Sequence, residues 1–184
     1  MSYPIAINEL TLTDMKAFRG GAVEAGIARA LHLAVATNRN ELVVYEALPL
    51  TNFGAAAYTQ ENYITGALAA AGVWQTSGDG AGVGTIPVGQ IAVFYKCANA
   101  AAVVPPLVTA VRFRVGATGA STKAVFFIQL MVENKMESDV YFSEPVVYDP
   151  QDRLFLQVYP TAIGAAEPVS FGCFIVSRLG PEIS

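Results

Sequence analysis

The chain of 184 residues contains a single histidine, His32, and any chemistry that needs an imidazole must use this residue. A zinc site with paired histidines is therefore excluded, and a Ser-His-Asp hydrolase would depend on His32 alone. No Gly-x-Ser-x-Gly sequence is present to support such a hydrolase. Because residues 28–33 have helical spacing, we interpret His32 as a helix-surface or capping residue.

Two groups of carboxylates could supply paired acids for glycoside hydrolysis or oxygen ligands for calcium. They are Glu133, Glu137 and Asp139, and Glu144, Asp149 and Asp152. Both groups fall in predicted turns, and neither has the alternating Asp/Asn ligands around a glycine that a calcium loop uses. We interpret them as solvated loop charges, with an enzyme that uses Glu144 and Asp149 as the alternative.

The glycine-rich stretch 78–84 has neither a Gly-Lys-Ser/Thr ending nor Gly-x-Gly-x-x-Gly spacing, so we interpret it as a loop and not as a phosphate site. The net charge of −4 has the wrong sign for a nucleic-acid surface, although Arg19, Arg29 and Arg39 could form a local basic patch. We therefore predict no catalytic residues, no cofactor, no metal and no nucleic-acid partner. The protein is expected not to be an enzyme.

The two cysteines, Cys97 and Cys173, each lie in an apolar run that is predicted to be a strand. We interpret them as small buried hydrophobic residues, with a disulfide as the less favoured alternative. Neither interpretation identifies a cellular compartment.

The elements that must position these residues are mostly strands. In the run 107–115, Val111 and Phe113 point to one face and Arg112 and Arg114 to the other, which is typical of a half-buried strand. Similar runs are predicted at 41–48, 90–98, 107–115, 123–132, 139–142, 145–148, 153–159 and 169–176. About eight short strands at close spacing predict an all-β fold, an antiparallel jelly roll or β-sandwich.

The N-terminal residues predict an arm that contains one or two short helices. Thr11 and Asp14 have the spacing of a capping box, and helical spacing continues to about Leu33. Gly20 and Gly21 weaken this helix, so we expect it to be broken. The arm could cap the sandwich of its own chain or dock on a neighbouring subunit.

We divide the chain into an arm at 1–40 and a sandwich at 41–184, with a long Gly/Ala-rich insertion at 51–89. The only tryptophan, Trp74, lies in the insertion. It either folds back on its own sandwich or contacts another subunit.

The composition predicts a surface that is covered by other subunits. Hydrophobic residues make up 53% of the chain and charged residues only 14%, against about 25% in ordinary soluble domains. No window reaches the roughly 18 apolar residues of a membrane span, and no secretory signal is visible at the start, so we expect no membrane partner. Burial against other copies or partners is the remaining way to cover such a surface.

Several predicted strands are apolar on both faces, and a two-sheet sandwich covers only one of them. We expect the second face to meet either the N-terminal helix or a neighbouring subunit. The candidate contact residues are Phe127, Met131, Phe155, Tyr159, Phe174 and Trp74.

The strand block 108–179, including the segments 109–115 and 153–159, and the arm at 1–33 resemble virion structural proteins. The chain looks most like the jelly-roll cement (decoration) proteins of tailed bacteriophages and next like single-jelly-roll capsid proteins. The resemblance implies a homotrimer on the capsid surface of the virion, bound to the major capsid protein and made in the host cytoplasm. A trimeric jelly-roll module that binds a receptor or carbohydrate is the alternative. No family residue can be transferred by position.

Overall fold

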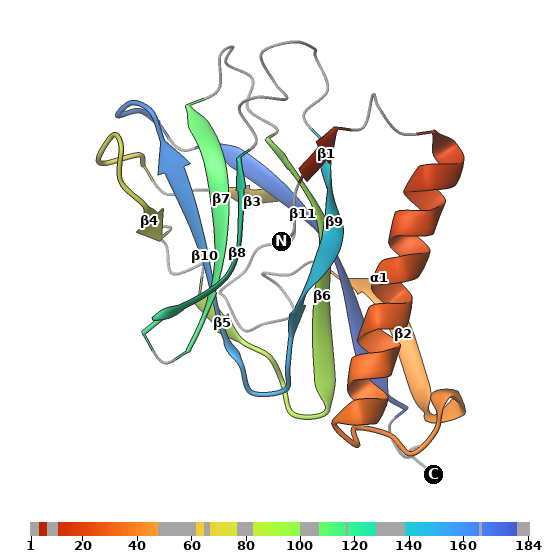
Figure 1. Cartoon of the computed structure of the whole chain (residues 1–184). Coiled ribbons are helices and arrows are strands. Elements are labelled where there is room, and N and C mark those ends of the chain that lie inside the picture. Colours follow the sequence, from red (N-terminus) through yellow and green to blue (C-terminus); the bar gives the residue numbers. More distant parts are fainter. Residues whose placement is uncertain are drawn as a thin grey trace.

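The computed structural model describes residues 4–6, 11–47, 62–64, 67–76, 83–99, 107–116, 118–127, 139–165 and 167–179 (Figure 1). Its helices are α1 (Leu12–His32) and the short 3-10 turn η2 (Arg39–Glu41). Its strands are β1 (Pro4–Ala6), β2 (Leu42–Ala47), β3 (Asn62–Ile64), β4 (Gln75–Thr76), β5 (Val83–Thr85), β6 (Gln90–Asn99), β7 (Val108–Val115), β8 (Ser121–Phe127), β9 (Asp139–Tyr148), β10 (Arg153–Pro160) and β11 (Pro168–Arg178).

The strands form two antiparallel sheets that face each other. The six-stranded sheet has the order β1-β9-β6-β11-β2, and β3 also pairs with β11. The five-stranded sheet has the order β4-β10-β7-β8, and β5 also pairs with β10. Four strand pairs nest inside one another along the chain, as in a long hairpin rolled into two sheets. From the innermost outward they are β7/β8, β6/β9, β4/β10 and β2/β11. This arrangement is a jelly roll, so the predicted fold class is confirmed.

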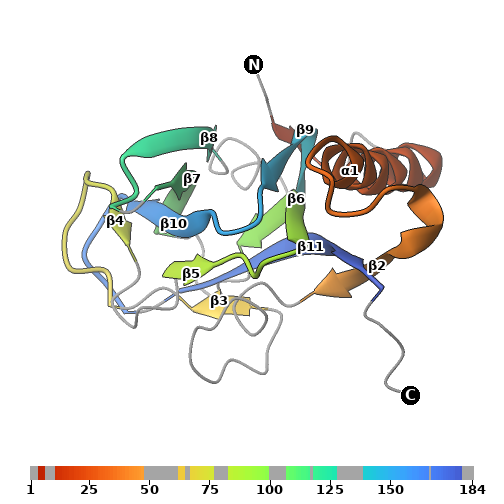
Figure 2. The ribbon, with the colours of Figure 1, turned by 90° about the horizontal axis from the view of Figure 1, so that it is seen from below.

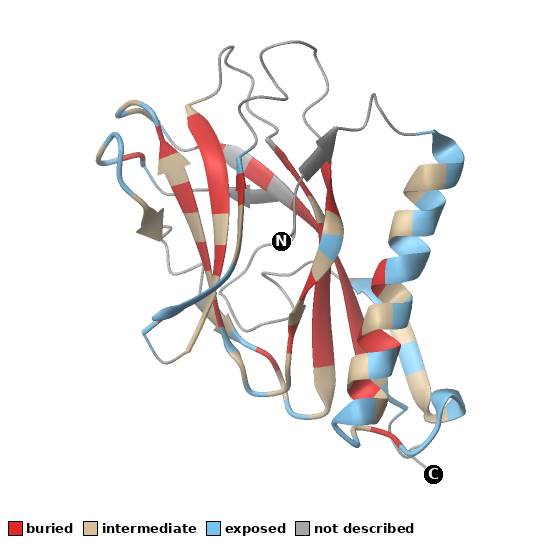
Figure 3. Ribbon diagram, in the orientation of Figure 1, coloured by how far each residue is buried: buried red, intermediate tan, exposed pale blue. Residues whose placement is uncertain are grey.

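The core lies between the two sheets, and Figure 3 shows the buried residues along their strands. β10 shows the pattern most clearly, because Leu154, Leu156 and Val158 are buried while the residues between them are half-buried. Stacked and edge-on phenylalanine rings fill the centre, among them Phe113 and Phe126 with ring centroids 5.9 Å apart. Apolar burial of this extent is the main stabilising contribution to the fold.

α1 is one continuous helix, and the prediction of a broken helix or two short ones was wrong. Its start was predicted correctly, since Thr11 Oγ1 accepts a hydrogen bond from the Asp14 amide at 3.2 Å and Asp14 Oδ2 accepts one from the Thr11 amide at 2.9 Å. Gly20 and Gly21 lie on the exposed side of the helix. Their cost of about 1 kcal/mol each is offset by tertiary packing, which sequence propensity does not include.

The helix covers the outer face of the six-stranded sheet, and Figure 2 shows it on that side of the sandwich. The helix of the arm therefore packs on its own chain. Ala22, Ile27 and Ala30 are buried against β6, β9 and β11. At Gly26, a Cβ atom would lie 2.7 Å from Val176 Cγ2 and 2.8 Å from Val93 Cγ2, so only glycine allows this close approach.

β9 carries a bulge that the sequence indicated only as a gap between two predicted strands. Phe94 of β6 pairs with Val146 and Lys96 pairs with Tyr141, so Tyr95 lies opposite residues 142–145. Pro145 has no amide hydrogen to donate to a ladder, which accounts for the interruption. The predicted strands at 139–142 and 145–148 are thus one strand, Asp139–Tyr148, with a bulge.

The described part of the predicted insertion contributes three short strands to the sandwich. β3 pairs with β11, and both β4 and β5 pair with β10. Buried Leu68 forms an isolated bridge with Gly164. Apart from the stretch 77–82 and other residues outside the described ranges, this region therefore belongs to the edges of the two sheets.

Two smaller predictions are confirmed. Cys97 and Cys173 are buried free thiols, and His32 lies exposed in the last turn of α1. In the described part of the chain, no helix has both the length and the apolar character that a membrane crossing requires.

Candidate functional site

The outer face of the five-stranded sheet gathers arginine and aromatic side chains, and we call it the arginine-aromatic face. Residues directly opposite one another in the ladders share a face of the sheet. The register therefore forms three rows across β8, β7 and β10. The rows are Phe127, Ala110 and Tyr159; Val125, Arg112 and Gln157; and Thr122, Arg114 and Phe155.

A hydrogen-bonded chain of side chains fixes the middle row. Arg112 donates from Nε to Gln157 Oε1 at 2.9 Å, and its Nη2 donates to the same oxygen. Gln157 Nε2 then donates to Thr76 Oγ1 at 2.9 Å, which extends the chain to β4. These contacts link side chains of β7, β10 and β4 and hold the Arg112 guanidinium group in one orientation.

Trp74 lies at the end of this row, immediately before β4. The Arg112 guanidinium carbon is 4.4 Å from the centroid of the indole ring, and the Tyr159 ring centroid is 5.3 Å from it at an interplanar angle of 60°. Such cation–π and edge contacts contribute about 1 kcal/mol each. Trp74 is thus half-buried against its own sandwich, which was one of its two predicted positions.

Phe155, in the row with Thr122 and Arg114, is held in place by neighbouring residues. The Arg153 guanidinium carbon lies 5.2 Å from the ring centroid. The turn between β7 and β8 also touches the ring: a Cβ atom on Gly119, whose φ is +64°, would lie 2.9 Å from Phe155 Cγ. Glycine is required there both by the backbone conformation and by the contact.

Phe127 is the most exposed aromatic residue of the face, because 58% of its surface is open to solvent. It lies on β8, which forms the edge of the five-stranded sheet. A large apolar side chain in that position has little to contact within the described part of the chain. Burial of such a ring against another protein surface is worth about 1.5 to 3 kcal/mol.

The arginines of the face differ in their surroundings from those of the helical arm. Arg19, Arg29 and Arg39 form ion pairs with Glu46, Asp149 and Glu24. The positive charge of these three arginines is therefore neutralised, and they do not form the basic patch that the sequence left open as an alternative.

Arg112 and Arg114 contact no carboxylate within the described residues, since Arg112 bonds the Gln157 amide and Arg114 bonds the Ala120 carbonyl at 2.9 Å. Burial and the neighbouring Arg114 lower the pKa of Arg112, although arginine stays charged at neutral pH. The face is therefore positive in a chain whose net charge is negative.

Two of the predicted acidic residues, Asp149 and Asp152, form ion pairs with basic side chains. Asp149 binds Arg29 through two hydrogen bonds of 2.6 and 2.8 Å, and Asp152 lies 3.3 Å from Lys123 Nζ. No group of three or more metal-ligating side chains occurs among the residues that the structure describes. Glu133, Glu137 and most of the glycine-rich stretch 78–84 lie outside them.

The structure brings four of the six predicted contact residues to this one face: Trp74, Phe127, Phe155 and Tyr159. Phe174 lies elsewhere, on the outer face of the six-stranded sheet. It is 7% exposed beneath α1 and stacks on Tyr95 with ring centroids 4.8 Å apart. Met131 lies outside the described residues.

The predicted contact residues did not include Arg112, Arg114 and Gln157. A signal for them was present, because each alternates with inward-facing apolar residues in a predicted strand. Their grouping depends on the register between β7 and β10, which local patterns do not specify.

No protein-family model matches the sequence, and no curated protein matches it either. The function of the face is therefore inferred from its residues.

Proposed function

We propose that this protein is a non-enzymatic structural protein of a viral particle that contacts neighbouring subunits through the arginine-aromatic face. The partners are other copies of the chain in a homotrimer and the major capsid protein, with the protein on the capsid surface. The observation that carries the proposal is the ordered group of Trp74, Arg112 and Tyr159 next to exposed Phe127. Tryptophan, tyrosine and arginine are the residues that most often dominate binding energy in protein interfaces.

Two properties of the face support a protein partner. First, Arg112, Trp74 and Tyr159 are already fixed by contacts within the chain, which lowers the conformational entropy lost on binding. Second, Arg112 and Arg114 contact neutral groups, so a surface with aspartate or glutamate would complement them. α1 covers the other sheet, whereas no described helix covers this one.

The viral assignment rests on the combination of a jelly roll with a composition of only 14% charged residues. A chain with so few charges favours burial within an assembly. Virion cement and capsid proteins, which the sequence pattern resembles, sit on or between capsid subunits and contact their neighbours.

Light scattering over a roughly hundredfold dilution range tests the contact between copies. We expect the wild-type protein to keep the mass of a trimer. Phe127→Ser should dissociate on dilution because it removes the exposed ring from the face. Val88→Ser is the matched control, since Val88 is 78% exposed in the turn before β6 and outside the face.

Co-sedimentation with virus particles tests the contact with the capsid. We expect the wild type and Val88→Ser to sediment with particles and Phe127→Ser to remain in the supernatant. A wild-type protein that is monomeric throughout and does not sediment with particles would contradict the proposal.

A carbohydrate-binding or receptor-binding module is the second candidate. The aromatic rings of Trp74 and Tyr159 lie beside the hydrogen-bonding groups of Gln157 and Arg112, a combination that suits a sugar. Arg112 already covers one face of the indole ring, which leaves less of it for stacking. A glycan array without any binder would exclude this candidate, and a binder that changes Trp74 fluorescence would favour it over the first.

A further inference from the structure

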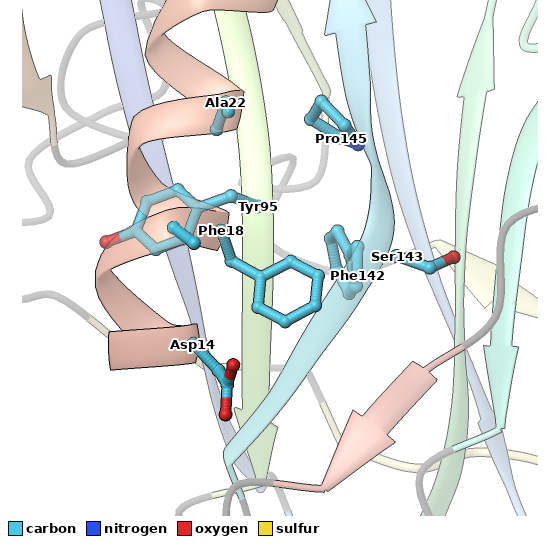
Figure 4. A pocket seen from close by; sticks show the side chains of 9 residues that line it. Asp14, Phe18, Ala22, Tyr95, Phe142, Ser143 and Pro145 are labelled. Atoms are coloured by element: carbon cyan, nitrogen blue, oxygen red, sulfur yellow. The ribbon is translucent and has the colours of Figure 1, made fainter. Parts of the chain in front are cut away.

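A pocket of about 340 Å³ lies between the N-terminal half of α1 and the bulge of β9 (Figure 4). One wall is a single face of the helix, formed by Asp14, Ala17, Phe18, Gly21 and Ala22. The other wall and the floor come from Tyr95 of β6 and from Phe142, Ser143 and Pro145 of β9. The pocket lies on the opposite sheet from the arginine-aromatic face.

Two features of the chain create this space. The bulge in β9 displaces residues 142–145 from the regular ladder opposite Tyr95. The helix faces the bulge with small side chains, and a Cβ atom on Gly21 would meet no atom within 4 Å. The C-terminal half of the same helix has no such space, because Gly26 is in close contact with Val93 and Val176.

The aromatic walls are held in place by contacts outside the pocket. Tyr95 donates its hydroxyl hydrogen to Glu46 at 2.6 Å and stacks on Phe174. The Phe18 ring centroid lies 6.1 Å from that of Tyr141. In Figure 4 the Phe18 ring points across the pocket toward β9. A pocket with prearranged rings and this volume falls in the range of about 300 to 1,000 Å³ that small-molecule sites occupy.

Asp14 gives the pocket a negative end. Its carboxylate accepts hydrogen bonds from the amide and the hydroxyl of Thr11, at 2.9 and 2.6 Å. These bonds hold the pKa of Asp14 below its usual range, so the group is ionised at neutral pH. Asp14 is the only charged residue that lines the pocket within the described part of the chain, and the nearby Arg19 pairs with Glu46 instead.

We propose that this pocket binds a small organic ammonium ion, with an aromatic or alkyl body between Phe18, Tyr95 and Pro145 and the cationic group toward Asp14. Aromatic faces and a carboxylate both attract a cation, and the small helix residues leave room for the body. An anion would be repelled by Asp14, and a neutral molecule would lose the charge interaction. The site is independent of the function proposed for the other sheet.

The test uses three probes of similar shape and different charge: phenethylammonium, phenethyl alcohol and hydrocinnamate. Titrations of the full chain at neutral pH, followed by calorimetry and by protein NMR, should give phenethylammonium a Kd on the order of 1 mM. The alcohol should bind about tenfold more weakly, and the anion should not bind measurably. Trp74 fluorescence should not change, because the indole lies on the other sheet.

Two pairs of variants assign the binding to the pocket. Gly21→Leu fills the space and should abolish binding, whereas Gly20→Leu places the same side chain on the preceding position, which does not line the pocket, and should not. Asp14→Asn should remove the preference for the ammonium ion over the alcohol. Thr11→Ala weakens the same helix cap but keeps the carboxylate, and should retain the preference. Equal affinity for the three probes, or binding that survives Gly21→Leu, would overturn the proposal.

Discussion

The contact between Arg29 and Asp149 joins two parts of the chain that are far apart in sequence. Arg29 lies near the end of α1, and Asp149 begins the turn between β9 and β10. The planar guanidinium group meets both carboxylate oxygens, at 2.8 and 2.6 Å. Such paired hydrogen bonds fix orientation as well as distance. The contact therefore ties the last turns of α1 to the turn that follows β9.

This ion pair predicts a dependence of stability on pH. The hydrogen bonds from Arg29 hold the pKa of Asp149 below its usual range in the folded protein, and Lys123 and His32 act in the same direction. The stabilisation is therefore present above the unfolded-state pKa, about 4, and is lost as the pH falls through the lower folded-state pKa. Asp149→Asn should lower the free energy of unfolding at pH 7 and leave it nearly unchanged near pH 2. Urea denaturation at the two pH values measures both.

Arg29→Met provides the matched control for this prediction. It removes the partner and should flatten the same part of the pH profile. The double variant should then behave like either single variant, because both remove one interaction. Additive losses in the double variant would show that Asp149 is stabilised by other groups.

At the scale of elements, replacing two glycines of α1 by alanine should change the stability of the protein in opposite directions. Gly20 has helical geometry and open space around its Cα, so Gly20→Ala should raise the free energy of unfolding by about 0.5 to 1 kcal/mol. Gly26→Ala should lower it by about 1 to 3 kcal/mol, because the new methyl group would collide with Val93 and Val176. Thermal unfolding followed by circular dichroism compares the two. A stabilising Gly26→Ala would mean that the helix can move away from the sheet at no cost.

The same helix illustrates what the sequence could predict. The capping box identified its start because two side chains three residues apart determine that structure locally. The prediction of a break failed because the helix gains its stability from packing on β6, β9 and β11, which are remote in sequence. Alternation of apolar residues likewise predicted the longer strands, whereas β1, β3, β4 and β5 have two or three residues each and carry no pattern.

The candidate site was predicted only in part, for a related reason. Phe155 and Tyr159 could be placed on the same side of one strand by counting, and Arg112 and Arg114 on one side of another. The pairing of Gln157 with Arg112 brings these two sides together on one face of the sheet. A shift by one residue would have separated them, and only the folded sheet determines that register.

At the scale of the whole molecule, the two thiols report on the opening of the sandwich. Cys97 and Cys173 lie in the core on the neighbouring strands β6 and β11, and burial raises the pKa of the Cys173 thiol. Neither should react with Ellman's reagent until both sheets separate. Labelling in increasing urea should follow the global unfolding curve for both thiols. Rapid labelling of one thiol in native buffer would reveal a local opening of the six-stranded sheet.

The nested order of the strands has a consequence for the synthesis of the chain. β2 cannot pair within the six-stranded sheet until β11 has been synthesised, because β11 is its partner and lies between β2 and β6. A ribosome must therefore release residues up to 178 before this sheet can form, and until then α1 has no complete surface to cover. During translation β2 therefore remains without its partner for several seconds at about 5 to 20 residues per second, whereas β7/β8 and β6/β9 can pair earlier. We therefore expect the chain to depend on chaperones until β11 has left the ribosome.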